Sequence, residues 1–346
     1  MSDAAVGVLV LYFGRWPRFF RFFLETCRHN PQFDFIIIGD CGKPEGAGIP
    51  PNCSFLPMTL KDLSRRASAA LGLRIELTYA YKVCDLKPAL GRIFEQELMG
   101  YEFWGYSDID VLFGNMGAFL TPEVRAAHDA LFVRKEYTTG SLFLMRNMPA
   151  VNDLFRRSPD HGRVFEDATR NYEFDECAGV YRELIAGQSI FDVPTPIVSF
   201  TEVVRAAERE GAIRAYFDAI ALEGLQRHAE VRMREGRLLC GDKEYALYHS
   251  VCEKSSPLFT FPNWGQVPPD YNVTRLGVFG VLETPSVMSI VINRGNQVLE
   301  HVAAKLRKGY SRARRGNWRA IVRHLGLTRA RSKKSGRPRS GNSSRS

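Results

Sequence analysis

Two short and almost continuously apolar runs near the N-terminus most constrain what this chain can fold into. Residues 6–13 (VGVLVLYF) and 33–39 (FDFIIIG) carry hardly any polar side chains, a pattern typical of strands that are covered on both faces. Between them, residues 18–29 place phenylalanines along one stripe, as an amphipathic helix does. A strand–helix–strand order of this kind favours a parallel sheet with helices on both sides.

The same alternation continues through the first half of the chain. We predict further strands at 54–57, 102–113, 130–133 and 142–145, and helices at 59–71 and 81–100, the second starting near Asp85 or Pro88. Residues 150–236 are more helical and more charged, residues 239–250 return to strand character, and the Pro- and Asn-rich residues 255–272 are irregular. The predicted fold class is α/β: a mostly parallel mixed sheet flanked by helices, with a helical insertion and a basic C-terminal tail.

The net charge of +9 is placed unevenly. Residues 301–346 contain 15 Lys and Arg and no acidic residue; subtracting these from the 47 in the chain leaves 32 basic against 38 acidic residues in 1–300, a net charge of −6. In the tail, basic residues alternate with Tyr310, Trp318 and aliphatic side chains, which suits an anionic membrane surface better than nucleic acid. A solvated tail without a partner is the alternative.

The cysteines and the N-terminal residues favour a location in the cytoplasm. The seven cysteines are an odd number without any CxxC pair, which favours reduced structural thiols in the cytoplasm. The N-terminus has no basic region before its apolar run, and no run approaches the roughly 20 apolar residues of a membrane span. We therefore expect a cytoplasmic protein that the tail attaches peripherally to the inner membrane face.

Two common nucleotide motifs are absent. The first strand leads into Tyr12-Phe13-Gly14-Arg15 without the glycines of a dinucleotide fingerprint. Around Gly42-Lys43, a phosphate-binding loop would need glycine at position 37 and Ser or Thr at position 44, which are Ile and Pro. A classical NAD site and a Walker ATPase are therefore excluded.

The most informative segment is FWGYSDIDVLFG, residues 103–114. An apolar strand runs into Asp108 and Asp110, and strand alternation predicts that both carboxylates point to the same side. Two like charges in a buried setting repel unless a cation lies between them, and carboxylate oxygens suit Mg²⁺ or Mn²⁺. The alternative is a solvated strand end at which Asp110 caps the next segment.

This segment, preceded by YKVCDLKPALGRIF and followed by YTTGSLFLMRN, resembles the core of GT-A-fold nucleotide-sugar glycosyltransferases. More narrowly, it resembles a bacterial group of uncharacterised glycosyltransferase-like proteins of cell-surface polysaccharide synthesis. The resemblance spans about residues 5–265 and is sharpest over 81–147. It implies that Asp108 and Asp110 bind Mn²⁺ or Mg²⁺ against the diphosphate of a nucleotide-sugar donor. It also implies a domain at 1–292, with a nucleotide-binding half at about 1–148 and an acceptor-side half at about 149–270. A basic amphipathic helical segment at 293–329 and a disordered tail at 330–346 follow.

On the donor side, the resemblance implies further contacts at positions that end or follow strands. Each has a structural alternative: packing explains Phe13, helix capping explains Asp85, an ordinary loop explains Gly140, and solvation explains a lysine. Thr139 stands near the place where the family has asparagine. The implied donor-binding residues are Tyr12, Phe13, Asp40, Asp85, Lys87, Thr139, Gly140 and Lys254.

On the acceptor side, the resemblance implies a carboxylate downstream of the core. Asp175 or Glu176 is the candidate general base for an acceptor hydroxyl, unless both only begin a helix. His249 is the candidate third metal ligand, since several such families return a C-terminal histidine to the cation; a hydrogen-bonded core histidine is the alternative.

The sequence thus predicts a glycosyltransferase of hexosyltransferase type that acts on a glycan or glycolipid acceptor in cell-surface polysaccharide synthesis. One rival is a phosphatase of the HAD type, whose DxD follows the first strand and not a later one. The other is a non-catalytic glycan- or membrane-binding protein on a degenerate transferase fold.

Overall fold

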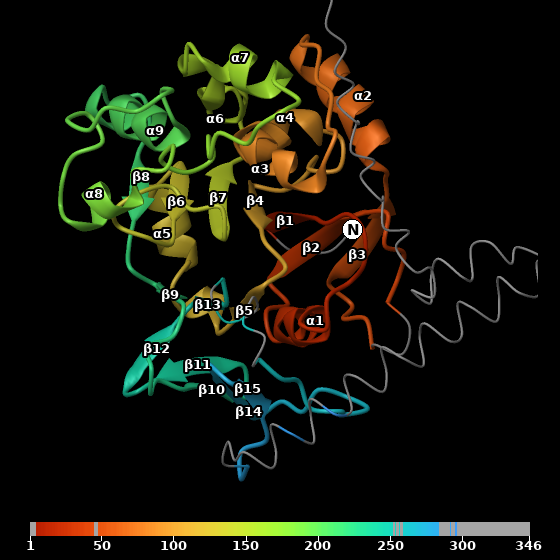
Figure 1. The fold of residues 1–346 in the computed structure, drawn as a ribbon. Helices are drawn as coiled ribbons and strands as arrows, with labels where there is room; N and C mark the ends of the chain where they lie inside the picture. The colour runs from red at the N-terminus through yellow and green to blue at the C-terminus, as the bar shows by residue number, and fades with distance from the viewer. Residues whose placement is uncertain are drawn as a thin grey trace, which may run out of the picture. The chain divides into compact units, whose positions relative to one another are not determined.

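The computed structural model describes residues 5–44, 48–251, 253, 256, 259–283, 291 and 295. The chain divides into two compact units, Met1–Ser286 and Val287–Ser346, and the helices and strands named in Figure 1 belong to the first. The predicted segments 293–329 (apart from position 295) and 330–346 lie outside the described residues, so the predicted boundaries there stay predictions.

The first unit is built on a mixed seven-stranded sheet in the order β3-β2-β1-β4-β7-β6-β8 (Figure 1). Only β7 runs antiparallel to its two neighbours; the other pairings are parallel. The predicted α/β class with a mostly parallel sheet flanked by helices is therefore confirmed. The strands are β1 (Val6–Leu11), β2 (Phe33–Gly39), β3 (Cys53–Pro57), β4 (Phe103–Ser107), β6 (Ala130–Phe132), β7 (Leu142–Arg146) and β8 (Ala215–Phe217).

Alternate residues of the central strands enter two separate cores, which explains their unbroken apolar runs. In β1, Leu9 and Leu11 pack on one face of the sheet, whereas Val8 and Val10 pack on the other. Burial of both faces removes the need for polar residues along the strand. Figure 1 shows α1 on one side of this sheet and α2, α3, α4 and α6 on the other.

The helices are mostly short. They are α1 (Phe20–Arg28), α2 (Leu60–Leu71), α3 (Val83–Leu86), α4 (Leu90–Ile93), α5 (Pro122–Ala127), α6 (Pro149–Asn152), α7 (His161–Glu166), α8 (Tyr181–Ile185) and α9 (Phe200–Arg209), with 3₁₀ turns η1 (Ala80–Lys82), η2 (Lys87–Ala89), η3 (Met116–Ala118) and η4 (Leu154–Arg157). The single helix predicted over 81–100 is wrong: the segment is η1, α3, η2 and α4 followed by turns. Pro88 cannot donate a backbone hydrogen bond and disfavours helical geometry at the residue before it.

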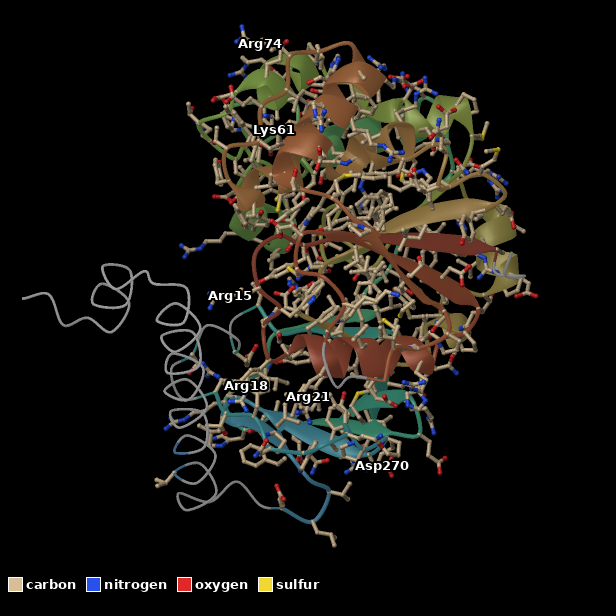
Figure 2. The ribbon with its side chains drawn as sticks, turned by 90° about the vertical axis from the view of Figure 1, so that its right-hand side faces the viewer. Arg15, Arg18, Arg21, Lys61, Arg74 and Asp270 are labelled. Carbon is tan, nitrogen blue, oxygen red and sulfur yellow. The ribbon has the colours of Figure 1, made fainter. Side chains whose placement is uncertain are left out.

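Helix α1 is apolar on more than one face because it lies between two sheets. Phe20 and Phe23 pack against the seven-stranded sheet, while Phe22 enters a second core formed with the C-terminal strands. On that second side, Arg21 donates from Nη2 to the Trp264 carbonyl at 2.6 Å. Figure 2 shows Arg18 and Arg21 beside the C-terminal strands that α1 covers.

Two further sheets form the C-terminal part of this unit. One is three-stranded, β5-β13-β9; the other is five-stranded and antiparallel, β12-β11-β10-β14-β15. The five-stranded sheet was not predicted, and the helical character expected up to residue 236 ends with α9. Their bounds are β5 (Val111–Phe113), β9 (Ala221–Glu223), β10 (Val231–Arg234), β11 (Arg237–Cys240), β12 (Lys243–Tyr245), β13 (Leu247–His249), β14 (Tyr271–Thr274) and β15 (Gly277–Phe279).

Candidate active site

The carboxyl ends of β1 and β4 mark the place where the order of the main sheet reverses. From β1 the chain continues to β2 and β3 on one side, and β4 pairs with β1 on the other. In open α/β sheets, ligands bind in the crevice outside the strand ends at such a switch point. Asp108 follows β4 directly, so the switch point coincides with the acidic motif.

Asp108, Asp110 and His249 converge at this point. One ligand atom of each lies within 4.8 Å of the others. His249 comes from β13, which pairs with β5 so that His249 lies opposite Val111, next to Asp110. The Ser250 amide and hydroxyl both donate to the Asp110 carbonyl, at 3.0 and 2.9 Å, and lock the two segments together.

The backbone does not bring the two aspartates together as predicted. The predicted strand over 102–113 is wrong, because it breaks into β4 and β5, which belong to different sheets, and Asp108–Asp110 is a turn between them. Strand alternation therefore does not orient the carboxylates. The turn does so, with Asp108 N donating to the Ser141 carbonyl at 3.2 Å.

The imidazole of His249 is held between two carboxylates. Nε2 lies 3.4 Å from Asp110 Oδ2, and Nδ1 lies 2.8 Å from Glu223 Oε2. Burial by itself lowers the pKa of His249, but the contacts with Asp110 and Glu223 raise it to about 10. The two carboxylates therefore favour the protonated form of this ring.

Lys87 is buried beside the metal ligands. Its Nζ lies 3.3 Å from Asp108 Oδ2 and 3.2 Å from Asp175 Oδ2, and it donates to the Gly140 carbonyl at 3.1 Å. Burial alone lowers the pKa of Lys87, but neighbouring acidic groups, Asp108 foremost, raise it well above its usual range. Tyr106 donates to the other oxygen of Asp108 at 2.8 Å. The positive charge of Lys87 thus lies in contact with one of the three candidate ligands, Asp108.

Asp175 and Glu176 lie on the same side of the cluster as Lys87. Asp175 is buried and engaged by that lysine, whereas Glu176 is half-buried. Glu176 accepts from the Gly140 amide at 2.9 Å and from the Tyr181 hydroxyl. The two predicted carboxylates therefore join the candidate site, with Glu176 the more accessible one.

Thr139 and Gly140 lie just before β7, and Gly140 is next to Lys87, Asp175 and Glu176. Gly140 leaves no room for a side chain, because an added Cβ would lie 2.5 Å from Asp175 Oδ2 and closer still to Lys87 Nζ. Thr139 is buried, and its hydroxyl is 3.0 Å from the Ser141 hydroxyl. The hydroxyl of Thr139 thus makes a hydrogen bond within the protein, and its predicted contact with the sugar stays a prediction.

Asp85 also has a structural role in place of the predicted donor contact. Its side chain is completely buried, forms an ion pair with Lys82 at 2.8 Å, and accepts from the amides of Tyr172 and Phe174. No oxygen of Asp85 is left for a ligand. It anchors the segment that leads into Asp175.

The remaining predicted donor contacts lie at the ends of β1 and β2. Tyr12 stacks on Trp16 with ring centroids 5.5 Å apart, and Phe13 is half-buried. Asp40 is exposed and accepts from the Gly14 amide at 2.7 Å. These positions border the switch point, as predicted from strand order. Lys254 lies outside the described residues.

The donor set of this cluster fits a divalent cation. Two carboxylates and one imidazole supply oxygen and nitrogen ligands, a set that suits Mn²⁺ and, through the oxygens, Mg²⁺. The ring nitrogen on the far side of His249 faces a carboxylate, an arrangement common to metal-binding histidines.

Four residues of the candidate site were not predicted from the sequence: Glu223, Ser141, Tyr181 and Tyr106. Glu223 belongs to a three-residue strand, and its pairing with β13 has no signal in the local sequence. Tyr106 lies in the acidic motif two residues before Asp108, a spacing that could have indicated its contact with Asp108. Ser141 and Glu223 are 82 residues apart in the sequence, whereas the Tyr181 hydroxyl donates to Glu176 only five residues away.

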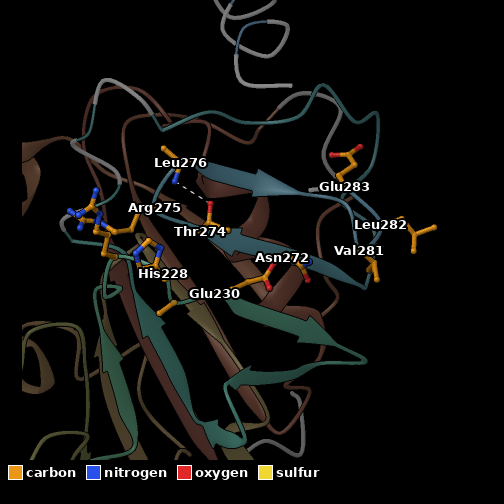
Figure 3. Close-up of a pocket in the computed structure, with 11 residues that line it drawn as sticks. His228, Glu230, Asn272, Thr274, Arg275, Leu276, Val281, Leu282 and Glu283 are labelled. Atoms are coloured by element: carbon orange, nitrogen blue, oxygen red, sulfur yellow. Dashed lines mark hydrogen bonds between the residues drawn. The ribbon is translucent and has the colours of Figure 1, made fainter. Parts of the chain in front are cut away.

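A pocket of about 420 Å³ lies elsewhere, on the five-stranded sheet between the 227–230 segment and β14 (Figure 3). His228 and Arg275 stand on one side of it and Leu282 on the other. None of its lining residues belongs to the cluster described above.

The chain is similar to several solved glycosyltransferase structures. The galactosyltransferase LgtC in complex with donor and acceptor sugar analogues is 9% identical, with a TM-score of 0.33, and the match covers 73% of this chain and 88% of that chain. Mouse xyloside xylosyltransferase 1 in its apo form is 8% identical, with a TM-score of 0.36 and coverage of 73% and 100%. The bifunctional glycosyltransferase WbbM is 10% identical, with a TM-score of 0.29 and coverage of 44% and 34%. At these TM-scores the likeness assigns no activity.

No curated protein matches the chain. Residues 8–195, more than half of its length, match a family of unknown function. The matched span includes Asp108, Asp110 and Lys87 and ends before Glu223 and His249. This chain therefore belongs to that family, DUF6625.

Proposed function

We propose that this protein is a metal-dependent glycosyltransferase that takes its sugar from a nucleotide-diphosphate donor. The observation that carries the proposal is the convergence of Asp108, Asp110 and His249 at the switch point of the main sheet. Carboxylates placed there attract a divalent cation, and an anionic diphosphate is the ligand that such a cation would bridge to the protein.

Charge balance supports a diphosphate as the ligand. A bound divalent cation supplies Lewis-acid stabilisation of the charge that develops on the departing nucleoside diphosphate. Asp108, Asp110 and His249 would hold that ion. Lys87 keeps Asp108 in place and contributes a further fixed positive charge. Tyr12 and Phe13 border the space where the base and ribose would lie.

On the acceptor side we assign the proton-accepting role to Asp175 or Glu176 and favour Glu176, which has exposed surface. The acceptor hydroxyl oxygen would form the new bond to the anomeric carbon. The bond from that carbon to the phosphate oxygen breaks, its electron pair leaves with the diphosphate, and the hydroxyl proton passes to the carboxylate. Gly140 N–H and the Tyr181 hydroxyl orient Glu176 for this role.

The finer parts of the proposal rest on the sequence resemblance and on charge. They are a hexose as the transferred sugar, a glycan or glycolipid acceptor in bacterial cell-surface polysaccharide synthesis, and work at the cytoplasmic membrane face. The 15 basic residues of 301–346 would provide attachment to anionic lipid.

Thermal unfolding with a panel of nucleoside diphosphates and Mn²⁺ tests the proposal. A ligand that binds the native state raises the unfolding temperature, so one nucleotide should raise it in the presence of Mn²⁺ and not with EDTA. Asp110→Asn should abolish that rise, whereas Glu244→Gln, a substitution on the five-stranded sheet and outside the cluster, should preserve it.

A panel of nucleotide sugars then provides the turnover assay. Metal-dependent release of the nucleoside diphosphate is the expected result. An Asp110→Asn protein with unchanged Mn²⁺-dependent nucleotide binding would contradict the site assignment. Phosphate release from a phospho-sugar without any nucleotide would favour a phosphatase.

A further inference from the structure

We infer that Glu223 is a positioning residue that fixes His249 as a metal ligand and ties it to the strand entry at Ser141. The inference rests on the proposed function, specifically on its metal centre. It concerns a residue that lies outside the span matched by the family and outside the acidic motif.

The first contact is with the histidine. Glu223 Oε2 lies 2.8 Å from His249 Nδ1. The parallel pairing of β9 with β13 places the two residues opposite each other, so the backbone register itself holds the carboxylate beside the ring. The side chains of His249 and Glu223 are only 13% and 20% exposed, which limits competition from water.

The second contact reaches the other side of the site. Glu223 Oε1 accepts from the Ser141 hydroxyl at 3.3 Å. The carbonyl of the same Ser141 accepts from the Asp108 amide at 3.2 Å. One carboxylate thus connects His249, which comes from a C-terminal strand, to the residue that fixes the turn bearing Asp108.

The chemistry of imidazole gives this geometry its consequence. A carboxylate that accepts from Nδ1–H keeps the proton on that nitrogen and leaves the Nε2 lone pair for a cation. Nε2 is the nitrogen that faces Asp110. The negative charge of Glu223 also increases the basicity of the ring, which strengthens a bond from Nε2 to a metal.

The test is Mn²⁺ titration of the full chain by calorimetry. Glu223→Ala should weaken Mn²⁺ binding by about 10- to 100-fold, the usual effect of losing such a partner. Glu223→Gln keeps the shape and an acceptor oxygen but removes the charge, so it should lose less affinity. His249→Ala should bind Mn²⁺ no more tightly than Glu223→Ala does, and Glu244→Gln should bind Mn²⁺ as tightly as the wild type.

A double mutant separates positioning from a general effect on the fold. If Glu223 acts mainly through His249, then Glu223→Ala should cost far less Mn²⁺ affinity when added to His249→Ala than when made alone. With Co²⁺ in place of Mn²⁺, the absorption spectrum should differ between Glu223→Ala and wild type, because the nitrogen ligand is misplaced. Glu223→Gln serves as the variant of unchanged shape should the alanine variant not fold.

The outcomes distinguish the inference from the function on which it rests. Wild-type affinity in Glu223→Ala, or an equal loss with and without His249, overturns the inference alone. A wild-type protein that binds no Mn²⁺ overturns the metal centre and the inference together. Mn²⁺ binding that depends on Glu223 without any sugar transfer sustains the inference and contradicts the proposed reaction.

Discussion

Gly140 leaves almost no space for a side chain between the charged groups of the candidate site. The Lys87 ammonium, the Asp175 carboxylate and the Glu176 carboxylate all approach its Cα from the side where a side chain would stand. Its own amide and carbonyl are hydrogen-bonded to Glu176 and Lys87. The absence of a Cβ lets two carboxylates and an ammonium meet around one backbone position.

Substitution of Gly140 by Ala should therefore destabilise the protein. The methyl group would push Lys87 and Asp175 apart in a packed interior, at a cost of about 1–3 kcal/mol. Urea unfolding of wild type and Gly140→Ala measures the difference. Gly162→Ala is the matched control: this glycine lies in α7 with its nearest neighbour 3.9 Å away, so stability should be unchanged or higher. Equal stability of Gly140→Ala and wild type would contradict the geometry.

The His249 ring should make Mn²⁺ binding depend on pH. Its pKa of about 10 means that the metal-free ring is protonated at neutral pH, and a metal must displace one proton from Nε2. Lower pH favours the proton and higher pH favours the metal. Mn²⁺ affinity should rise about tenfold for each pH unit between roughly pH 6.5 and 8.5.

Calorimetry at several pH values measures this slope, and His249→Ala should lose most of it. The number of protons released on Mn²⁺ binding, obtained from buffers of different ionisation enthalpy, gives an independent check. A slope that is the same in both proteins would place the proton on another group.

At the scale of elements, short helix α3 and the segment around residues 172–176 form one unit. Asp85 at the end of α3 binds two amides of this segment, and the Thr201 hydroxyl and amide both donate to the carbonyl of Glu176. Glu173 and Ala178 adopt positive φ angles of 53° and 52°, which costs energy for residues other than glycine. The surrounding hydrogen bonds hold this backbone in place and so present Asp175 and Glu176 to the site.

Removal of the Asp85 charge should strongly destabilise the protein. Asp85→Asn leaves the fully buried Lys82 ammonium without a counter-charge, which typically costs about 3–5 kcal/mol. Urea unfolding checks this, and the double variant Lys82→Met/Asp85→Asn should recover part of the loss. If Asp85→Asn lowers the free energy of unfolding by less than about 1 kcal/mol, the Lys82–Asp85 ion pair does not stabilise the segment around residues 172–176.

The element scale also shows how far local sequence patterns reach. Continuous apolar runs predicted β1 and β2, and a Thr59–Asp62 capping box with Gly72 at the C-terminus delimits α2. Patterns failed at 81–100 and 102–113, where packing divides the chain into shorter pieces. The acidic motif was recognised from its residues, but the turn that orients it was not.

At the scale of the whole molecule, charge separates the folded body from the tail. Among the described residues, no helix is long and apolar enough to cross a bilayer. The proposed membrane attachment rests on the 15 basic residues of 301–346, a segment that contains no acidic residue.

Deletion of residues 301–346 should abolish binding to anionic vesicles. Each Lys or Arg near such a surface contributes about 1 kcal/mol at low salt, so the full chain should sediment with anionic and not with neutral vesicles, and 0.5 M salt should release it. Mn²⁺ binding should survive the deletion, because its ligands lie within Met1–Ser286. Equal binding to neutral vesicles would contradict an electrostatic tail, and loss of Mn²⁺ binding would make the tail part of the fold.

The sequence by itself determined the class of fold and the position of the acidic motif after a buried strand. Strands buried on both faces must be apolar throughout, and a pair of aspartates after such a strand requires a cation or solvent. Both features can therefore be recognised from a short stretch of sequence. The sequence resemblance named His249 and Lys87 as candidates, but only the tertiary structure decided that these distant residues meet the motif. His249 and Glu223 arrive through strand pairing, and Lys87 through burial beside Asp108. Those contacts join segments separated by 21 to 140 residues, and no local periodicity encodes them.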